Sequence, residues 1–402
     1  MRFTLSVCLL ALPLAGWAQA PLTEAEAVRL GLARAEVADL ERGAVQAAEA
    51  DVLAAGRLPN PTLSYSRERV DGTPATVEQT WMLEQAVDLS GRRGLRREAA
   101  GRRVAAVTAD NAARQLEMTA EIRRNFHEVM FLQETIRASE IWARRFARIE
   151  DVIGKLARAG EASGYDRRRL ARERQTADAR LASGRAELDR AMARLMALTG
   201  ASDVALLQGE LLPSPPAPVE TVLARLDQRP DLQSLRRRAE AADLDGRAAR
   251  RGAIPAVTVG IGPRFVDSGS TQDNGVALSL SVPLPVFDRQ QAQQQRAAAE
   301  ALQARAEYQL AKRRAEGELR GLHRQTESLR ATAIDYRQQA VAASPELLRI
   351  AEAAYRGGES SLLELLDAYR GTLETETTAL ELEKRARDAR IEYELLSGSI
   401  GQ

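Results

Sequence analysis

Cysteine is nearly absent from this chain of 402 residues: the only one is Cys8, inside an apolar N-terminal stretch. Arg2, the apolar run and Ala18-Gln19-Ala20 form the pattern of a secretory signal peptide over residues 1–20. Removal of this peptide leaves a mature chain with no disulfide, no thiolate metal site and no cysteine nucleophile. A membrane anchor is an alternative, but the apolar run falls short of the ~20 residues that a spanning helix needs. Acylation of Cys8 is another, although Val7 stands where a small residue is required.

An excess of charge of one sign is also missing, since 57 Lys and Arg face 56 Asp and Glu. No basic stripe interleaved with aromatic residues occurs, so nothing predicts a nucleic-acid partner. Aromatic residues make up only 4% of the sequence and alanine is abundant, which suits long helices packed through small side chains. No segment after residue 20 reaches the length of a transmembrane helix. A secreted chain of this kind is predicted to be periplasmic or an outer-membrane β-barrel.

The residue patterns that usually carry chemistry are scarce as well. There is no nucleotide-binding loop, no His-Glu-x-x-His motif and no nucleophile–base pair. The two histidines, His127 and His323, lie at almost the same height of two long predicted helices. Two imidazoles without carboxylate or thiolate spacing make a poor zinc site, which favours ordinary positions on the helix surface. The sequence therefore predicts no catalytic residue, no cofactor and no metal site, and a protein that is not an enzyme.

What the chain does contain is an internal duplication, with corresponding segments roughly 197 residues apart. Each copy is predicted to form a helix, two strands, a very long helix, a glycine turn and a returning helix. Three pairs of matching residues show the register: Pro61 and Pro255, Arg92 and Arg289, and Gly160 and Gly358.

Proline, glycine and hydrophobic spacing set the expected boundaries. No proline occurs between Arg92 and about residue 159, which predicts a helix on the order of 100 Å long. Ile122, Phe126 and Val129 repeat at spacings of four and three, as in a coiled-coil seam. The predicted organisation is a signal peptide at 1–20, a first repeat at 21–200, a Pro-rich equatorial linker at 201–218 and a second repeat at 219–402. In the first repeat the strands are expected within 62–88 and the helical hairpin at 92–198, with its turn near 160–164. In the second repeat the strands are expected within 256–285 and the helical hairpin at 289–397, with its turn near 357–361.

One predicted strand places Val276, Leu278, Leu280 and Val282 on one face and small or polar residues on the other. Soluble half-buried strands and outer-membrane strands both show this alternation. No neighbouring globular segment could cover the apolar face, which favours lipid. A sheet in hydrocarbon must close, and four strands are fewer than the about eight that closure needs. The predicted fold is therefore mainly α with a membrane β-barrel: three copies supply about twelve strands, and their helical hairpins continue the pore as an α-helical barrel.

The segments PNPTLSYSRE, EQAVDLSGRRGLRREAA and SVPLPVFDRQQ, together with the duplicated order of elements, resemble the TolC-like outer membrane efflux protein family. The resemblance covers essentially the whole mature chain and is closest to the branch that serves cobalt-zinc-cadmium cation efflux. It implies a homotrimer in the outer membrane, with a twelve-stranded β-barrel and a helical barrel in the periplasm. It further implies a passive exit duct for heavy-metal cations or small toxic compounds, fed by an inner-membrane pump of the RND type through a periplasmic adaptor.

The resemblance also implies roles for the hairpin tips. Glu364 and Asp367 would form stacked acidic rings at the periplasmic entrance, where they attract cations; solvated charges on a helix surface are the alternative. Asp166 would take part in gating, although Ser360 stands where the family's latch arginine would be. Adaptor docking would fall on Gly160, Glu161, Ser163, Gly357, Gly358, Ser361 and Leu362.

Two other functions stay open at this point. A type I polypeptide secretion duct uses the same fold. A periplasmic coiled-coil adaptor or scaffold also carries a long helical hairpin. An adaptor, however, has one hairpin inserted in a β-domain, whereas this sequence predicts two equivalent hairpins and amphipathic strands.

Overall fold

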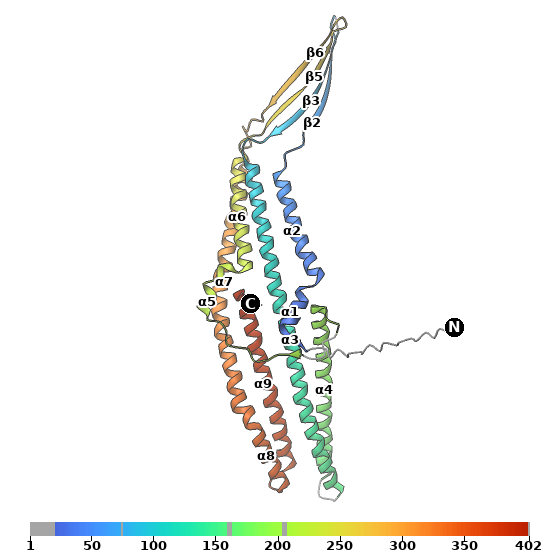
Figure 1. Ribbon diagram of the computed structural model, residues 1–402, viewed down its shortest axis with the longest axis vertical. Helices are drawn as coiled ribbons and strands as arrows, with labels where there is room; N and C mark the ends of the chain where they lie inside the picture. Colours follow the sequence, from blue (N-terminus) through green and yellow to red (C-terminus); the bar gives the residue numbers. More distant parts are fainter. Residues whose placement is uncertain (1–20, 74, 159–162, 203–206, 401–402) are drawn as a thin grey trace, which may run out of the picture.

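The computed structural model describes residues 21–73, 75–158, 163–202 and 207–400. The molecule is long and narrow, with a small sheet at one end and the turns of two helical hairpins at the other (Figure 1). The prediction of a mainly helical chain with a tandem-repeat architecture is confirmed. The expected signal peptide lies outside the described residues.

The sheet contains two hairpins, one from each repeat. The first is β2 (Thr62–Val70) with β3 (Thr76–Val87), and the second is β5 (Val257–Asp267) with β6 (Gln272–Ser281). The strand order is β2-β3-β5-β6 and every neighbouring pair is antiparallel. The two copies therefore meet at the β3–β5 pair, and β2 and β6 form the two edges.

The register places apolar side chains in rows across one face of the sheet. Leu63 lies opposite Leu83, Leu83 opposite Ile261, and Ile261 opposite Leu278. All four side chains are at least half exposed. The opposite face carries polar and small residues, such as the row Thr62, Glu84, Gly260 and Ser279. The sheet is thus amphipathic, and nothing in the described part of the chain covers its apolar face.

Gly262 marks a close approach between the two repeats. A Cβ on Gly262 would lie 1.8 Å from the carbonyl oxygen of Trp81, so only glycine fits. The next residue, Pro263, has no N–H to donate to β3. The β3–β5 ladder accordingly skips Trp81 and Met82 and resumes at Leu83.

The first repeat is organised around one helix. Helix α3 (Arg92–Arg158) has 67 residues, or about 100 Å, and α4 (Gly164–Thr199) returns along its lower half (Figure 1). Helices α1 (Glu24–Leu32) and α2 (Ala35–Gly56) run beside α3 towards the sheet. The predicted seam of Ile122, Phe126 and Val129 is buried and packs against Ala27 and Leu195.

The second repeat follows the same plan with an irregular long helix. Helices α5 (Val219–Leu223) and α6 (Pro230–Arg251), with the short 3-10 turn η1 (Leu226–Gln228), precede the sheet. After it, α7 (Gln291–Tyr336), a π-helical turn η2 (Arg337–Val341) and α8 (Ala342–Arg356) form one continuous helix, and α9 (Leu362–Ser397) returns. The π-turn lies just ahead of Pro345, which stands inside α8 and cannot donate a backbone hydrogen bond.

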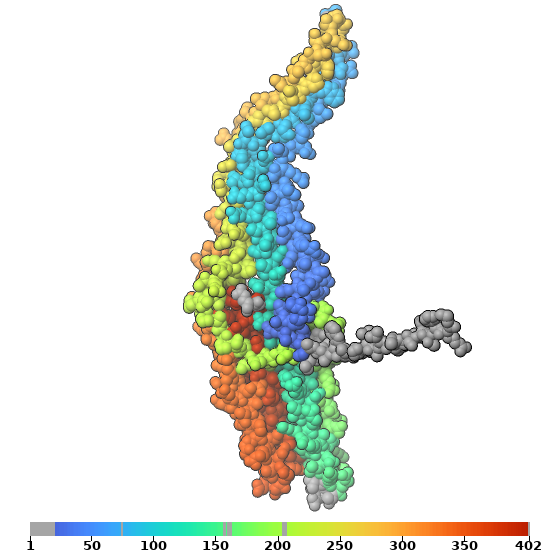
Figure 2. Space-filling view, in the orientation of Figure 1, coloured from blue at the N-terminus to red at the C-terminus, as the bar shows by residue number. Residues whose placement is uncertain are grey.

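The linker between the repeats crosses the middle of the molecule. Its described part, 207–218, begins with β4 (Leu207–Gln208), which pairs in parallel with β1 (Leu22–Thr23). In Figure 2 it is the yellow-green band that crosses the face of the molecule near its middle.

Among the helices of the described ranges, none has an apolar stretch of the length and hydropathy that crossing a bilayer requires.

Candidate functional site

The tip of the second hairpin is a tight turn closed by backbone hydrogen bonds. Gly358 has a left-handed backbone with φ of 74°, and its N–H donates to the carbonyl of Tyr355 at 3.1 Å. Helix α9 then begins with a capping box. The Ser361 hydroxyl accepts from the Glu364 N–H at 3.4 Å, and the Glu364 carboxylate accepts from the Ser361 N–H at 2.8 Å. The turn between α8 and α9 is therefore fixed by its own sequence.

The first tip uses the same device. Ser163 caps α4: its hydroxyl accepts from the Asp166 N–H at 3.1 Å and donates to Oδ2 of Asp166 at 2.7 Å. Asp166 and Glu364 thus hold equivalent positions at the starts of the two returning helices. The predicted docking residues Gly160 and Glu161 lie outside the described residues.

A shared apolar cluster holds the two hairpins together above the tips. Phe146 and Ile153 of α3 and Leu170 of α4 pack with Leu348 of α8 and Leu366 of α9. Burial and the Asp166 carboxylate both raise the pKa of the Tyr355 hydroxyl above its ordinary value. The charge of Asp166, the predicted gating residue of the first tip, thus acts on a side chain of the second hairpin.

The predicted entrance residues lie on the outward face of α9. Leu362, predicted as a docking residue, is buried together with Leu365, whereas Glu364 and Asp367 are exposed. Gly357, Gly358 and Ser361 are exposed, as docking requires.

Further carboxylates continue this exposed face along the helix. Glu374 and Glu381 follow Asp367 at heptad spacing and are exposed. Asp367, Glu374 and Glu381 make no ion pair with any described residue. From Glu364 to Glu381 the line spans about 25 Å. We call Glu364, Asp367, Glu374 and Glu381 the acidic line of α9. The first two were identified from the sequence, and counting heptads from Asp367 would have identified the other two.

A second cluster of charges lies at the equator, where α1, α3 and α9 meet. The His127 imidazole, only 1% exposed, donates from Nε2 to Glu24 at 2.7 Å. Arg123 forms ion pairs with Glu24 and, at 2.5 Å, with Glu394 of α9. Burial alone would raise the pKa of Glu24, but the hydrogen bond from His127 and the charge of Arg123 lower it to about 2. Burial lowers the pKa of His127, which keeps the ring neutral. The interpretation of His127 as a helix-surface residue is therefore wrong.

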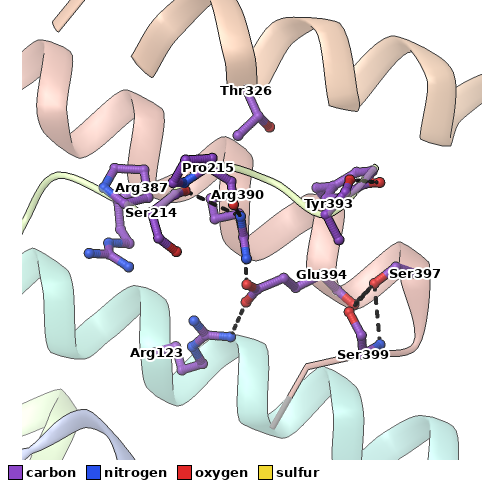
Figure 3. A network of polar contacts seen from close by, with 12 residues as sticks. Arg123, Ser214, Pro215, Thr326, Arg387, Arg390, Tyr393, Glu394, Ser397 and Ser399 are labelled. Atoms are coloured by element: carbon purple, nitrogen blue, oxygen red, sulfur yellow. Dashed lines mark hydrogen bonds and ion pairs between the residues drawn. The ribbon is translucent and has the colours of Figure 1, made fainter. Parts of the chain in front are cut away.

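The same region of α9 binds the linker through its backbone carbonyls. Arg387 donates to the carbonyl oxygens of residues 210–212. Arg390 donates to those of Ser214 and Pro215 (Figure 3). The Tyr393 hydroxyl donates to the carbonyl of Ala217 at 2.8 Å. Because Arg390 also pairs with Glu394 at 2.6 Å, linker and buried charges form one network. No local sequence pattern predicted these hydrogen bonds between α9 and the linker.

On the sheet, the predicted lipid-facing residues Val276, Leu278 and Leu280 are about three-quarters exposed, and Val282 lies just beyond the end of β6. In the described ranges, no three His, Cys, Asp or Glu side chains are grouped closely enough to hold a metal ion.

Known proteins resemble this chain both in sequence and in fold. The model of the outer membrane efflux protein family matches residues 224–399. The cobalt-zinc-cadmium resistance protein CzcC of Cupriavidus metallidurans is 28% identical over 331 residues, which is 80% of this chain and 77% of that protein.

Two solved structures share the fold. The CmeC outer membrane channel of Campylobacter jejuni superposes with a TM-score of 0.77 at 15% identity, covering 99% of this chain and 94% of its own. The open state of the MtrE outer membrane channel of Neisseria gonorrhoeae gives 0.74 at 19% identity, covering 94% and 89%. The fold shared with these structures consists of two paired helical hairpins continued by a four-stranded sheet. Residues 224–399 thus match the outer membrane efflux protein family, and the chain as a whole has the fold of these solved channels.

Proposed function

We propose that three copies of this chain form a channel of the outer membrane that serves as the passive exit duct of a tripartite efflux system. The observation that carries the proposal is the sheet, which has one apolar exposed face and two open edges. Open edges are not tolerated in hydrocarbon, and four strands cannot close on themselves. Three sheets supply about twelve strands, enough for an open pore.

The strand order supports closure by identical copies. Within one sheet every pair is antiparallel, and the number of strands is even. The edge strand β6 of one copy and the edge strand β2 of the next therefore run in opposite directions. Joining them continues the antiparallel ladder around the barrel without a change of pattern.

The helical hairpins extend the pore into the periplasm in this proposal. Six hairpins surround one axis, and their tips meet a periplasmic adaptor that connects the duct to an inner-membrane pump of the RND type. The cargo is proposed to be a heavy-metal cation, as the name of the CzcC relative suggests. The acidic line of α9 supports this cargo: if it faces the axis, three copies surround the path with carboxylates, which attract cations and repel anions. The duct contributes geometry and charge and no covalent chemistry.

The test is reconstitution of the purified protein. We expect a trimer that fractionates with the outer membrane, migrates differently on gels before and after heating, and conducts ions in planar bilayers. Crosslinking that yields a stable soluble monomer or dimer would refute the proposal and favour a periplasmic adaptor or scaffold. Deletion in the native host separates the two kinds of duct: sensitivity to cobalt, zinc or cadmium supports metal efflux, whereas loss of a secreted polypeptide supports a secretion duct.

A further inference from the structure

A groove separates the two hairpins about midway between the equator and the tips. Its walls are α3 on one side and η2 with α8 on the other, and α9 forms its floor. The cavity volume is about 570 Å³, within the range of pockets that bind small molecules. Figure 2 shows the seam where the orange and red second hairpin meets the green first hairpin. We call this cavity the interhairpin groove.

The interior of the interhairpin groove is apolar. Trp142 from α3, Leu348 from α8 and Leu373 from α9 line it, and all three belong to the apolar cluster that joins the hairpins. Ile141 and Ala138 extend the apolar surface along the α3 wall. A hydrocarbon or aromatic group placed here would leave water for contact with these side chains.

The charges around the groove are not balanced. Each carboxylate that lines it already has a partner: Glu134 pairs with Arg137, Glu352 accepts from the Tyr369 hydroxyl, and Glu376 pairs with Arg337. Arg145 and Arg148, one turn apart on α3, also line the groove and make no ion pair with any described residue. The groove thus combines an apolar interior with two guanidinium groups free to bind an anion.

Trp142 adds an unused donor. Its side chain is 8% exposed, and among the described residues its indole N–H has no hydrogen-bond partner. A buried donor without an acceptor is unfavourable and calls for an explanation. An oxygen atom of a bound molecule would satisfy it.

The groove depends on an irregular backbone. The π-turn η2 and Pro345 shape the α8 wall, where Val341 and Pro345 line the cavity. Single π-turns are rare in helices and concentrate at functional sites. The irregularity therefore lies at the cavity itself.

We infer that the interhairpin groove binds an amphiphile with an anionic head group, whose apolar body packs on Trp142 and Leu348 and whose head group pairs with Arg145 and Arg148. Such a molecule would touch α3 of the first hairpin and α8 of the second at once. Binding would tie the hairpins together and resist any movement of one against the other. The site lies within one chain, so it is independent of the proposed duct function.

The experiment uses quenching of tryptophan fluorescence by a brominated chain. Trp142 and Trp81 are the only tryptophans after residue 20, so a Trp81→Phe background leaves Trp142 as the sole reporter of the mature protein. The probe is 11-bromoundecanoate, added to the purified full-length protein in lipid nanodiscs. We expect quenching that saturates with probe concentration. The uncharged 11-bromo-1-undecanol, which has the same chain, should quench only weakly.

Two variants and one control decide the outcome. Replacing both Arg145 and Arg148 with Gln should raise the Kd by about tenfold or more, since it removes both charge-assisted contacts. Ala138→Phe should fill the groove and abolish saturable quenching, while trimer migration on gels stays normal. The matched control replaces both Arg167 and Arg168 of α4 with Gln. These two residues are exposed and lie outside the groove, so the Kd should stay unchanged. The site would be overturned if quenching rose linearly with probe concentration, or if the Arg145 and Arg148 variant and the Arg167 and Arg168 variant bound the probe with the same Kd. Ion conductance of the same protein tests the proposed duct function separately.

Discussion

Leu280 of β6 lies directly opposite Val259 of β5, and both side chains are exposed on the same face of the sheet. Their neighbours along the strands, Ser279 and Gly260, pair on the other face. A single step along β6 therefore moves a side chain from the apolar face to the polar one.

This alternation gives the first prediction. Leu280→Lys should impair assembly by about 2–4 kcal/mol if the position lies near the membrane midplane, because the ammonium group would face hydrocarbon. Ser279→Lys is the matched control. It should be tolerated, since Ser279 faces Glu84 on the polar side, where a lysine finds a partner. The yield of heat-modifiable trimer measures both, and equal damage at the two positions would contradict the assigned faces.

The close approach at Gly262 gives the second prediction. Gly262→Ala places a methyl group 1.8 Å from the Trp81 carbonyl, so β3 and β5 must separate. We expect a loss of about 1–3 kcal/mol, the usual effect of forcing an extra methyl group into a packed site. Gly275→Ala in β6 meets nothing within 4 Å and is the control. Urea unfolding of the purified protein compares the two variants; an unaffected Gly262 variant would show that the two repeats are not joined so closely.

The equatorial charges give the third prediction, a loss of stability in acid. The pKa of Glu24 is lowered from 4.5 to about 2, so its stabilisation is complete above about pH 4.5 and is lost as the pH falls towards 2. The pKa of His127 is also lowered, so the folded state opposes its protonation and loses stability below pH 6.5. Both effects act in the same direction.

The size of the Glu24 effect is at most about 3 kcal/mol. Thermal unfolding followed by circular dichroism at pH 7, 5 and 3 should show a falling Tm, with a flatter profile for Glu24→Gln. Glu49→Gln, at an exposed position of α2, is the control. A profile for Glu24→Gln as steep as that of the parent would place the acid sensitivity elsewhere.

Periodicity and duplication were enough to predict the order of elements and the amphipathic sheet, because these depend on local spacing. The buried seam of Ile122 and Phe126 followed from the same rule. The burial of His127 could not be predicted: its partner Glu24 is far away in sequence, and only the packing of α1 on α3 brings them together. The carbonyl contacts of Arg387 likewise depend on where the linker crosses α9, which no residue pattern encodes.

At the second tip, Glu364 was identified from the sequence, but its role in capping α9 was not predicted. Ser361 and Glu364 have the spacing of a capping box, and the structure uses them as one. The resemblance to known channels drew attention only to the negative charge of Glu364. A test of the acidic rings must therefore remove charge without removing the cap.

The last prediction follows from this point. Glu364→Gln with Asp367→Asn removes both charges but keeps side chains that accept hydrogen bonds, whereas alanine at Glu364 would also cost the cap. If the two carboxylates ring the entrance in a trimer, the pair of substitutions should abolish block of single-channel current by divalent or trivalent cations added from the periplasmic side. Membrane insertion should not change, since the sheet is at the other end of the molecule (Figure 1). Glu374→Gln, further along the acidic line, should weaken block less because Glu374 lies further from the tip of the hairpin than Glu364 and Asp367 do. Recordings of the double variant that keep the parent's cation block would show that these residues are solvated surface charges and that the entrance is lined by others.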